Sequence, residues 1–164
     1  MRMNHQDHVD LLRNAIGTAG TRWADFGSGD GAFTLALRDL LGPAAEIFSI
    51  EKDRVRLDAQ KRNFRSMFPQ SSVQFIHADF TQSPPLRYGD ALQSLNPSIS
   101  SLDGIVMANS LHYFKDKEKI LRHVRGFLKP NGALLLVEYN VDSGNLWVPH
   151  PFVRRGEHKG AFCP

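Results

Sequence analysis

The stretch Asp25-Phe26-Gly27-Ser28-Gly29-Asp30-Gly31 decides the fold predicted for this chain. It follows a short apolar run at 22–26 and precedes apolar residues at helical spacing over 33–41, so it predicts a strand, a glycine-rich turn and a helix. Glycines let the backbone approach a ligand closely, and the helix start beyond them offers unpaired N–H groups. The alternative is a tight strand-to-helix turn that binds nothing.

The chain on either side of this turn alternates between strand and helix patterns. We expect strands at 22–26, 45–50, 73–76, 105–108 and 133–137, and helices at 5–16, 33–41, 55–67 and 117–128. In the helix at 55–67 we place Val55, Ala59 and Phe64 on the apolar side. This alternation predicts an α/β fold, a parallel sheet with helices on both faces that binds ligands at the carboxyl ends of its strands. The Pro- and Ser-rich segment 81–101 is expected to be a long binding loop or lid.

Polar residues follow the next expected strands. Glu51 lies 24 residues after Gly27, at a strand end where a carboxylate can accept both hydroxyls of a ribose. Asp79 follows the third strand and can accept from an adenine amino group while Phe80 packs on the ring. The alternatives are a solvated charge at Glu51 and a turn-forming role for Asp79. Residues 109–114, after the fourth strand, are expected to border the ligand and its reaction partner.

Two kinds of ligand fit the glycine turn. Gly27, Gly29 and Ala32 match the dinucleotide pattern G-x-G-x-x-G/A, so an NAD-linked oxidoreductase is one interpretation. Against it, Asp25 at the mouth of the site would favour a cationic group over a pyrophosphate. The spacing of the glycines is also tighter than is usual for dinucleotides.

The order of five motifs resembles class I S-adenosylmethionine-dependent methyltransferases of the small methyltransferase-domain group. The motifs are DFGSGDG, IFSIEKD, IHADF, LDGIVMANSLHYF and LRHVRGFLKPNGALLLVEYN, within residues 20–140. The resemblance implies a Rossmann-like doubly wound parallel sheet of five strands in the order 3-2-1-4-5. It also implies S-adenosylmethionine as cofactor and S-adenosylhomocysteine as product.

The resemblance assigns roles to residues at the strand ends. Asp25 and the glycines would face the methionine part of the cofactor, Glu51 would hold the ribose, and Asn109 would lie near the methionine end or the transferred methyl. The full set of expected cofactor-binding residues is Asp25, Gly27, Ser28, Gly29, Gly31, Glu51, Lys52, Asp79, Phe80 and Asn109. In such proteins the N-terminal helix tends to lie over the cofactor, which would bring His5, Gln6 or His8 near it.

His112 is the candidate catalytic residue. A histidine titrates in the range that suits a general base, which is needed only if the methyl acceptor must lose a proton to react. The alternative is a partly buried histidine that shapes the pocket. Tyr113 next to it is a weaker candidate for a base.

Composition limits the remaining classes. The single cysteine, Cys163, rules out an internal disulfide framework, and no metal site is expected because His5 and His8 have no clear third ligand. The net charge of +3 comes from Lys and Arg scattered among Asp and Glu, which is no strong nucleic-acid signal. We find no signal peptide and no run of apolar residues that would span a bilayer, so a cytoplasmic protein without a membrane contact is expected.

The chain is expected to form one domain over residues 1–164, with an N-terminal helix in 1–20, a cofactor-binding core in 21–140 and an irregular tail in 141–164. Full-length members of the resembling group continue with a helix and an antiparallel strand pair, for which few residues remain after Asn140. The fifth strand would then be an exposed edge, through which a homodimer is possible. The expected function is methyl transfer to a small-molecule acceptor. A cofactor-binding module that acts through a partner, without catalysis, is the second interpretation.

Overall fold

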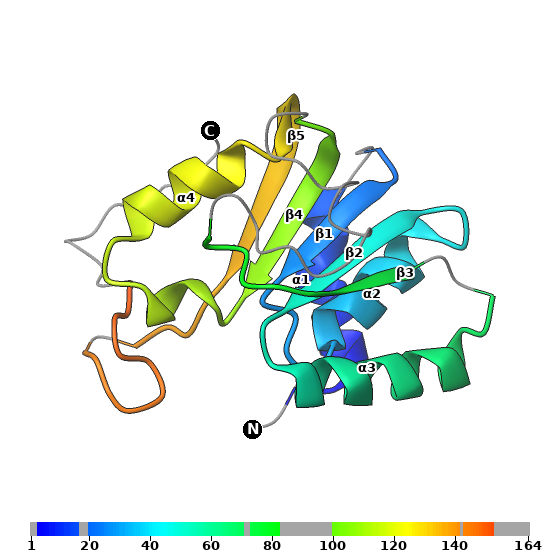
Figure 1. Cartoon of the computed structure of the whole chain (residues 1–164), viewed down its shortest axis with the longest axis horizontal. Coiled ribbons are helices and arrows are strands. Elements are labelled where there is room, and N and C mark those ends of the chain that lie inside the picture. Colours follow the sequence, from blue (N-terminus) through cyan, green and yellow to red (C-terminus); the bar gives the residue numbers. More distant parts are fainter. Residues whose placement is uncertain (1–2, 17–19, 71–72, 83–99, 142, 153–164) are drawn as a thin grey trace.

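The computed structural model describes residues 3–16, 20–70, 73–82, 100–141 and 143–152, which contain a sheet of five parallel strands (Figure 1). The strands are β1 (Arg22–Phe26), β2 (Glu46–Glu51), β3 (Val73–His77), β4 (Leu102–Ala108) and β5 (Leu128–Val137). Their order is β3-β2-β1-β4-β5, so the predicted Rossmann-like order is confirmed. Because every pairing is parallel, the carboxyl ends of all five strands lie along one edge, at the bottom of Figure 1.

Helices cover both faces of this sheet, as predicted. The helices are α1 (His5–Ile16), α2 (Ala32–Leu41), α3 (Arg54–Met67) and α4 (Lys117–Arg125), with a short 3₁₀ helix η3 (Leu111–Tyr113) after β4. Figure 1 shows α4 and the α1–α2 pair on opposite sides of the sheet. The helix α3 lies against β2 and β3, where the Phe64 and Phe75 ring centroids are 5.6 Å apart.

The core consists of two apolar clusters, one on each face of the sheet. On the first face, the buried α1 side chains Val9, Leu12 and Ile16 pack with α2 and with Trp23 of β1. Full burial of one such aliphatic side chain stabilises the fold by roughly 1.5–3 kcal/mol. The second face holds the larger cluster, in which α4 and the even-numbered residues of β1 and β2 meet. A strand that is buried on both faces reads as a continuous apolar run, which is why these strands are visible in the sequence.

One buried side of a helix differs from the prediction. In α3 the buried residues are Leu57, Gln60 and Phe64, whereas Val55 is 78% exposed. Asp53 begins this helix by accepting hydrogen bonds from the amides of Val55 and Arg56, at 2.9 and 3.2 Å, and so turns residue 55 outwards. The predicted placement of Val55 on the apolar side is therefore wrong.

A second difference lies between α4 and β5. The helix ends at Arg125 and not at Leu128, because the amides of Gly126 and Phe127 bond to the carbonyls of His123 and Val124 in a tight final turn. Leu128 then pairs with Leu102 as the first residue of β5.

Residues 83–99 of the predicted loop and 153–164 of the predicted tail lie outside the described residues. Within the described residues, no helix has the length and the apolar character that crossing a bilayer requires.

Candidate functional site

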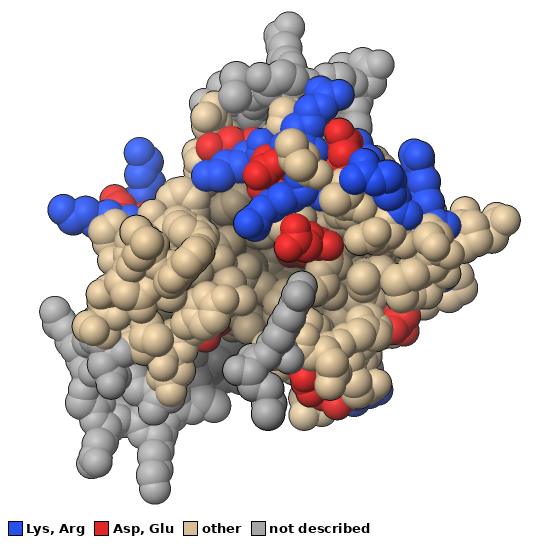
Figure 2. Space-filling model, turned by 90° about the horizontal axis from the view of Figure 1, so that it is seen from below, with Lys and Arg blue, Asp and Glu red and all other residues tan. Residues whose placement is uncertain are grey.

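A pocket of about 330 Å³ opens at the carboxyl edge of the sheet. Figure 2 looks onto this edge and shows Lys and Arg side chains gathered along one side of it, with acidic side chains among them. The residues that line the pocket come from the ends of β1 to β4 and from the first turn of α3. They are Gly27, Gly29, Glu51, Lys52, Asp53, Arg56, Ala78, Asp79, Phe80, Asn109, Ser110, Tyr113 and Phe114.

The glycine turn forms one wall of the pocket through backbone shapes that favour glycine. Gly27, Gly29 and Gly31 have φ values of 76°, 54° and 85°. A Cβ on Gly27 would lie 2.9 Å from the Cβ of Ser110, so the turn and the segment after β4 touch without room for a side chain. The amides of Gly27 and Ser28 donate to the carbonyl of Ile50, at 2.9 and 3.0 Å, and tie the turn to the end of β2.

Glu51 lies beside the glycine turn and lines the pocket, as the sequence predicts. Its Oε2 accepts from the Gly29 amide at 2.8 Å and its Oε1 from the Asp53 amide at 2.8 Å. The side chain is 7% exposed, and its carboxylate oxygens keep lone pairs that can accept further hydrogen bonds. Lys52, next in the chain, is exposed and also lines the pocket.

Asp79 and Phe80 form the wall beyond β3. The Asp79 Oδ1 accepts from the Thr81 amide at 3.0 Å and from the Thr81 hydroxyl at 2.6 Å, so this carboxylate closes a turn and also faces the pocket. Phe80 stacks on Phe26 with ring centroids 5.2 Å apart. The Phe80 carbonyl accepts from Nε2 of His123 at 2.8 Å. His123 is half-buried on α4, and this hydrogen bond anchors the wall to that helix.

The segment after β4 supplies a further wall, next to the glycine turn. Asn109 lines the pocket with φ of 49°, a left-handed conformation that is uncommon outside glycine and that concentrates at functional sites. The Ser110 hydroxyl donates to the Phe26 carbonyl at 3.2 Å. Tyr113 and Phe114 complete the wall with aromatic surface.

Three of the predicted cofactor-binding residues lie behind the pocket wall and do not line it. Asp25 is 1% exposed, and its Oδ2 accepts from the Thr34 hydroxyl at 2.7 Å. Its Oδ1 has no hydrogen-bond partner among the described residues. Burial, together with the nearby charge of Glu51, raises the pKa of Asp25 from 3.8 to about 7. Ser28 and Gly31 face α3, so seven of the ten residues meet at the pocket.

His112 also lies outside the pocket lining. It is 1% exposed, and its Nδ1 is 2.5 Å from Oε2 of Glu138, while Oε1 of Glu138 accepts from the Leu111 amide at 2.7 Å. The His112 carbonyl accepts from the His150 amide at 3.0 Å. Glu138 therefore fixes η3 to the end of β5, and η3 carries Tyr113 at the pocket wall.

Comparison with known proteins gives the family of this chain. Residues 18–154 match the family model described as a methyltransferase domain. The chain belongs to this methyltransferase family. Its fold and the position of its pocket agree with the resemblance seen in the sequence.

Individual relatives of this methyltransferase-family chain are distant. The ubiquinone/menaquinone biosynthesis C-methyltransferase UbiE of Pasteurella multocida is 25% identical over 121 residues, which cover 74% of this chain and 41% of UbiE. The chain thus spans less than half the length of that curated relative.

Solved structures share the fold of the family across different named activities. Coclaurine N-methyltransferase, bound to N-methylheliamine and SAH, has a TM-score of 0.63 at 18% identity, and the match covers 80% of this chain and 35% of that one. The [4+2]-cyclase SpnF also has a TM-score of 0.63, at 21% identity, and the match covers 85% of this chain and 47% of that one. At these identities the likeness is one of fold.

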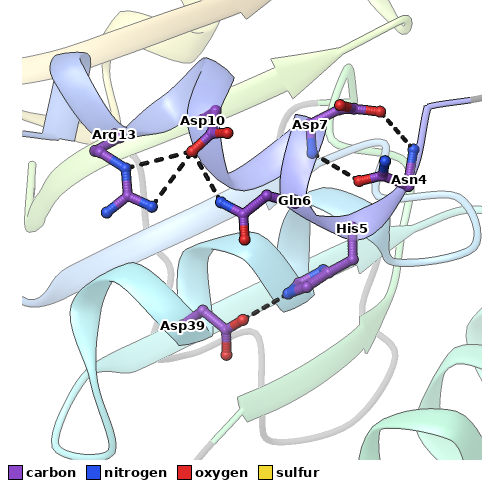
Figure 3. Close-up of polar contacts among 7 residues, drawn as sticks. All are labelled: Asn4, His5, Gln6, Asp7, Asp10, Arg13 and Asp39. Atoms are coloured by element: carbon purple, nitrogen blue, oxygen red, sulfur yellow. Dashed lines mark hydrogen bonds and ion pairs between the residues drawn. The ribbon is translucent and has the colours of Figure 1, made fainter.

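The side chains of α1 expected near the cofactor point elsewhere, as Figure 3 shows for two of them. His5 Nε2 lies 2.5 Å from Oδ2 of Asp39 on α2, and Gln6 donates to Asp10 at 2.9 Å. His8 packs edge-on against Phe33, with centroids 4.9 Å apart. None of the three is among the residues that line the pocket. Their contacts are with α2, on which α1 packs.

Sequence reasoning missed three residues around the site: Arg56, Gln60 and Glu138. Arg56 lines the pocket because Asp53 caps α3 and points its first turn at the glycine turn. Glu138 directly follows β5, in the same kind of position as Asp79 after β3, and this position was the available signal. Gln60 interrupts the buried side of α3, which the predicted placement of Val55 concealed.

Proposed function

We propose that this chain binds S-adenosylmethionine in the pocket and transfers its methyl group to a small-molecule acceptor. The supporting observation is that Glu51, Asp79 and the glycine turn, which are far apart in the sequence, line one pocket. Its volume of about 330 Å³ is that of a small-molecule site, for which roughly 300–1,000 Å³ is usual.

The charges around the pocket fit a cationic cofactor. Three carboxylates and two cations line the pocket, so its wall carries a net negative charge that attracts a positively charged group. They are Glu51, Asp53 and Asp79, with Lys52 and Arg56. Asp25, directly behind the turn, has a buried oxygen without a partner in the part of the chain that the structure describes. Burying such an oxygen is costly unless a donor or a positive charge lies nearby. In our proposal Glu51 accepts from the ribose hydroxyls, Asp79 accepts from the adenine amino group, and Asp25 attracts the cationic methionine end.

The bound cofactor supplies an activated methyl group, so the chain has mainly to align the acceptor and to exclude water. We assign the alignment to Asn109, Tyr113 and Phe114, which line the pocket after β4. For His112 the geometry favours the pocket-shaping role over that of a base. Its buried side chain contacts Glu138, and its ring centroid lies 4.3 Å from that of the wall residue Tyr113.

Titration calorimetry with S-adenosylhomocysteine and NAD tests the cofactor assignment. We expect S-adenosylhomocysteine to bind and NAD to bind far more weakly, whereas tight NAD binding would refute the assignment and favour an oxidoreductase.

Replacement of Glu51 by Ala should weaken S-adenosylhomocysteine binding by about 1–3 kcal/mol, because the ribose loses its charged acceptor. Asp58→Ala is the control. Asp58 lies on the same helix, pairs with Arg54, is half-buried and does not line the pocket, so this variant should bind as the wild type does.

A module that binds the cofactor without catalysis is the second candidate. The sequence leaves this interpretation open beside methyl transfer. Transfer of a labelled methyl group to candidate acceptors separates the two functions. Binding without transfer to any acceptor, alone or with a partner protein, would support the module. A cytoplasmic location and association of two copies through the β5 edge are also proposals from the sequence.

A further inference from the structure

A chain of buried polar side chains lies beneath the glycine turn, between α2 and α3. Its members are Asp25, Thr34, Ser49 and Gln60, each 2% exposed or less. The Thr34 hydroxyl donates to Asp25, and the Ser49 hydroxyl donates to Oε1 of Gln60 at 2.5 Å. Buried polar groups of this kind are costly unless their hydrogen bonds are made, so their arrangement is specific.

Gln60 connects these buried polar side chains to the glycine turn itself. Its Nε2 donates to the Ser28 hydroxyl at 3.1 Å and lies 3.3 Å from the Gly29 carbonyl oxygen, to which it also donates. The Ser28 and Ser49 hydroxyls are 2.7 Å apart. One amide group on α3 therefore fixes two successive residues of the turn, while Gln60 itself does not line the pocket.

The absence of a side chain at Gly31 leaves room for the side chain of Gln60. A Cβ on Gly31 would lie 2.3 Å from Cγ of Gln60, so a side chain at position 31 and Gln60 exclude each other. Gly31 does not line the pocket. The last glycine of the motif thus makes room for Gln60, in addition to its left-handed φ of 85°.

We propose that Gln60 is a positioning residue for cofactor binding, which acts by holding Ser28 and Gly29 from below. This inference rests on the proposed function. Gly29 also donates its amide to Glu51, so the turn residue that Gln60 holds is the one that orients the ribose-binding carboxylate. A turn that is held in its binding shape before the ligand arrives avoids the entropy cost of ordering on binding.

The first test is Gln60→Met, which keeps the size of the side chain and removes its hydrogen bonds. We expect the dissociation constant of S-adenosylhomocysteine to rise about tenfold in calorimetry, the loss that follows from two hydrogen bonds of ordinary net strength. Gln74→Met is the matched control, because Gln74 donates to Glu46 at 3.0 Å between β3 and β2 and does not line the pocket. The control should bind S-adenosylhomocysteine as the wild type does.

The second test is Gln60→Glu, which distinguishes positioning from a merely structural role by its pH profile. A protonated carboxyl can donate one hydrogen bond to the turn, whereas a carboxylate donates none. We therefore expect a smaller loss of affinity at about pH 5 than at about pH 8, where it should reach about tenfold, since burial raises the pKa of an introduced carboxyl. Charged groups in and around the turn include Asp25, Asp30, Glu51 and Arg56. The wild type is therefore measured at both pH values, and the ratio of the variant's dissociation constant to that of the wild type is compared between them.

The outcomes separate the two levels of the proposal. Two results would overturn the role of Gln60 and leave the proposed function intact. One is wild-type affinity in Gln60→Met. The other is a dissociation constant of Gln60→Glu, relative to that of the wild type, that does not change with pH. If Gln60→Met does not fold, the pH profile of Gln60→Glu decides. Failure of the wild-type protein to bind S-adenosylhomocysteine would refute the proposed function, and the inference with it.

Discussion

At the scale of single residues, the most unusual group is the carboxyl of Asp25. It lies on a strand that is buried on both faces, with one oxygen bonded to Thr34 and the other without a partner among the described residues. The carboxylates of Glu51 and Asp79, which line the pocket, accept hydrogen bonds from backbone amides. Burial, together with the charge of Glu51, raises the pKa of Asp25 to about 7, because a carboxylate at this position is poorly solvated.

This pKa predicts how stability depends on pH. Between about pH 4 and pH 7 the folded protein keeps the Asp25 proton that the unfolded chain releases, so the folded state binds more protons and the free energy of unfolding falls as pH rises. The fall attributable to Asp25 is at most about 4 kcal/mol. Asp25→Asn cannot ionise, so urea unfolding should show a free energy that falls less over this window than in the wild type. Equal slopes in the two proteins would contradict the raised pKa.

At the scale of elements, the docking of α1 depends on apolar burial more than on its polar contacts. Figure 3 shows a capping arrangement in which the amide of Asn4 donates to Asp7 and the amide of Asp7 donates to Asn4, at 2.8 and 3.0 Å. The pair of His5 with Asp39 links α1 to α2, yet the two side chains are 39% and 37% exposed. Water and salt screen such a pair, so its contribution to stability is small.

This contrast predicts unequal costs for two substitutions in α1. Leu12→Ala removes a side chain that is 1% exposed and should lower the free energy of unfolding by about 2–5 kcal/mol. His5→Ala should cost no more than about 1 kcal/mol. Chemical denaturation measures both, and a His5→Ala cost equal to that of Leu12→Ala would show that the surface pair holds the helix.

At the scale of the whole molecule, β5 forms one edge of the sheet in the part of the chain that the structure describes. Leu136 on this strand is 41% exposed. An edge strand with free hydrogen-bonding groups and apolar side chains is suited to pairing with another strand. β5 is thus an edge strand within the described residues, and association of two copies through it stays a proposal.

Association through this edge is testable by sedimentation equilibrium. We expect the wild-type chain to form dimers, and we expect Leu136→Lys to shift the equilibrium towards monomer because a lysine on an edge strand opposes pairing. Leu11→Lys is the control, since Leu11 is 50% exposed on α1, away from the edge. A wild-type chain that is monomeric at all concentrations, or a dimer that persists in Leu136→Lys, would contradict this mode of association.

The sequence by itself determined the strands, the helices, the strand order expected from the resemblance, and the positions of Gly27, Glu51, Asp79 and Asn109 at the pocket. These features depend on local patterns and on the rule that parallel strands end at one edge, so they are visible in one dimension. The tertiary structure alone decided that Asp25 and His112 lie behind the wall and that Gln60 holds the glycine turn. Asp25 lies on a strand buried on both faces, where alternation carries no signal. Gln60 meets Ser28, 32 residues away, only because α3 packs against the turn with a side that its sequence does not reveal.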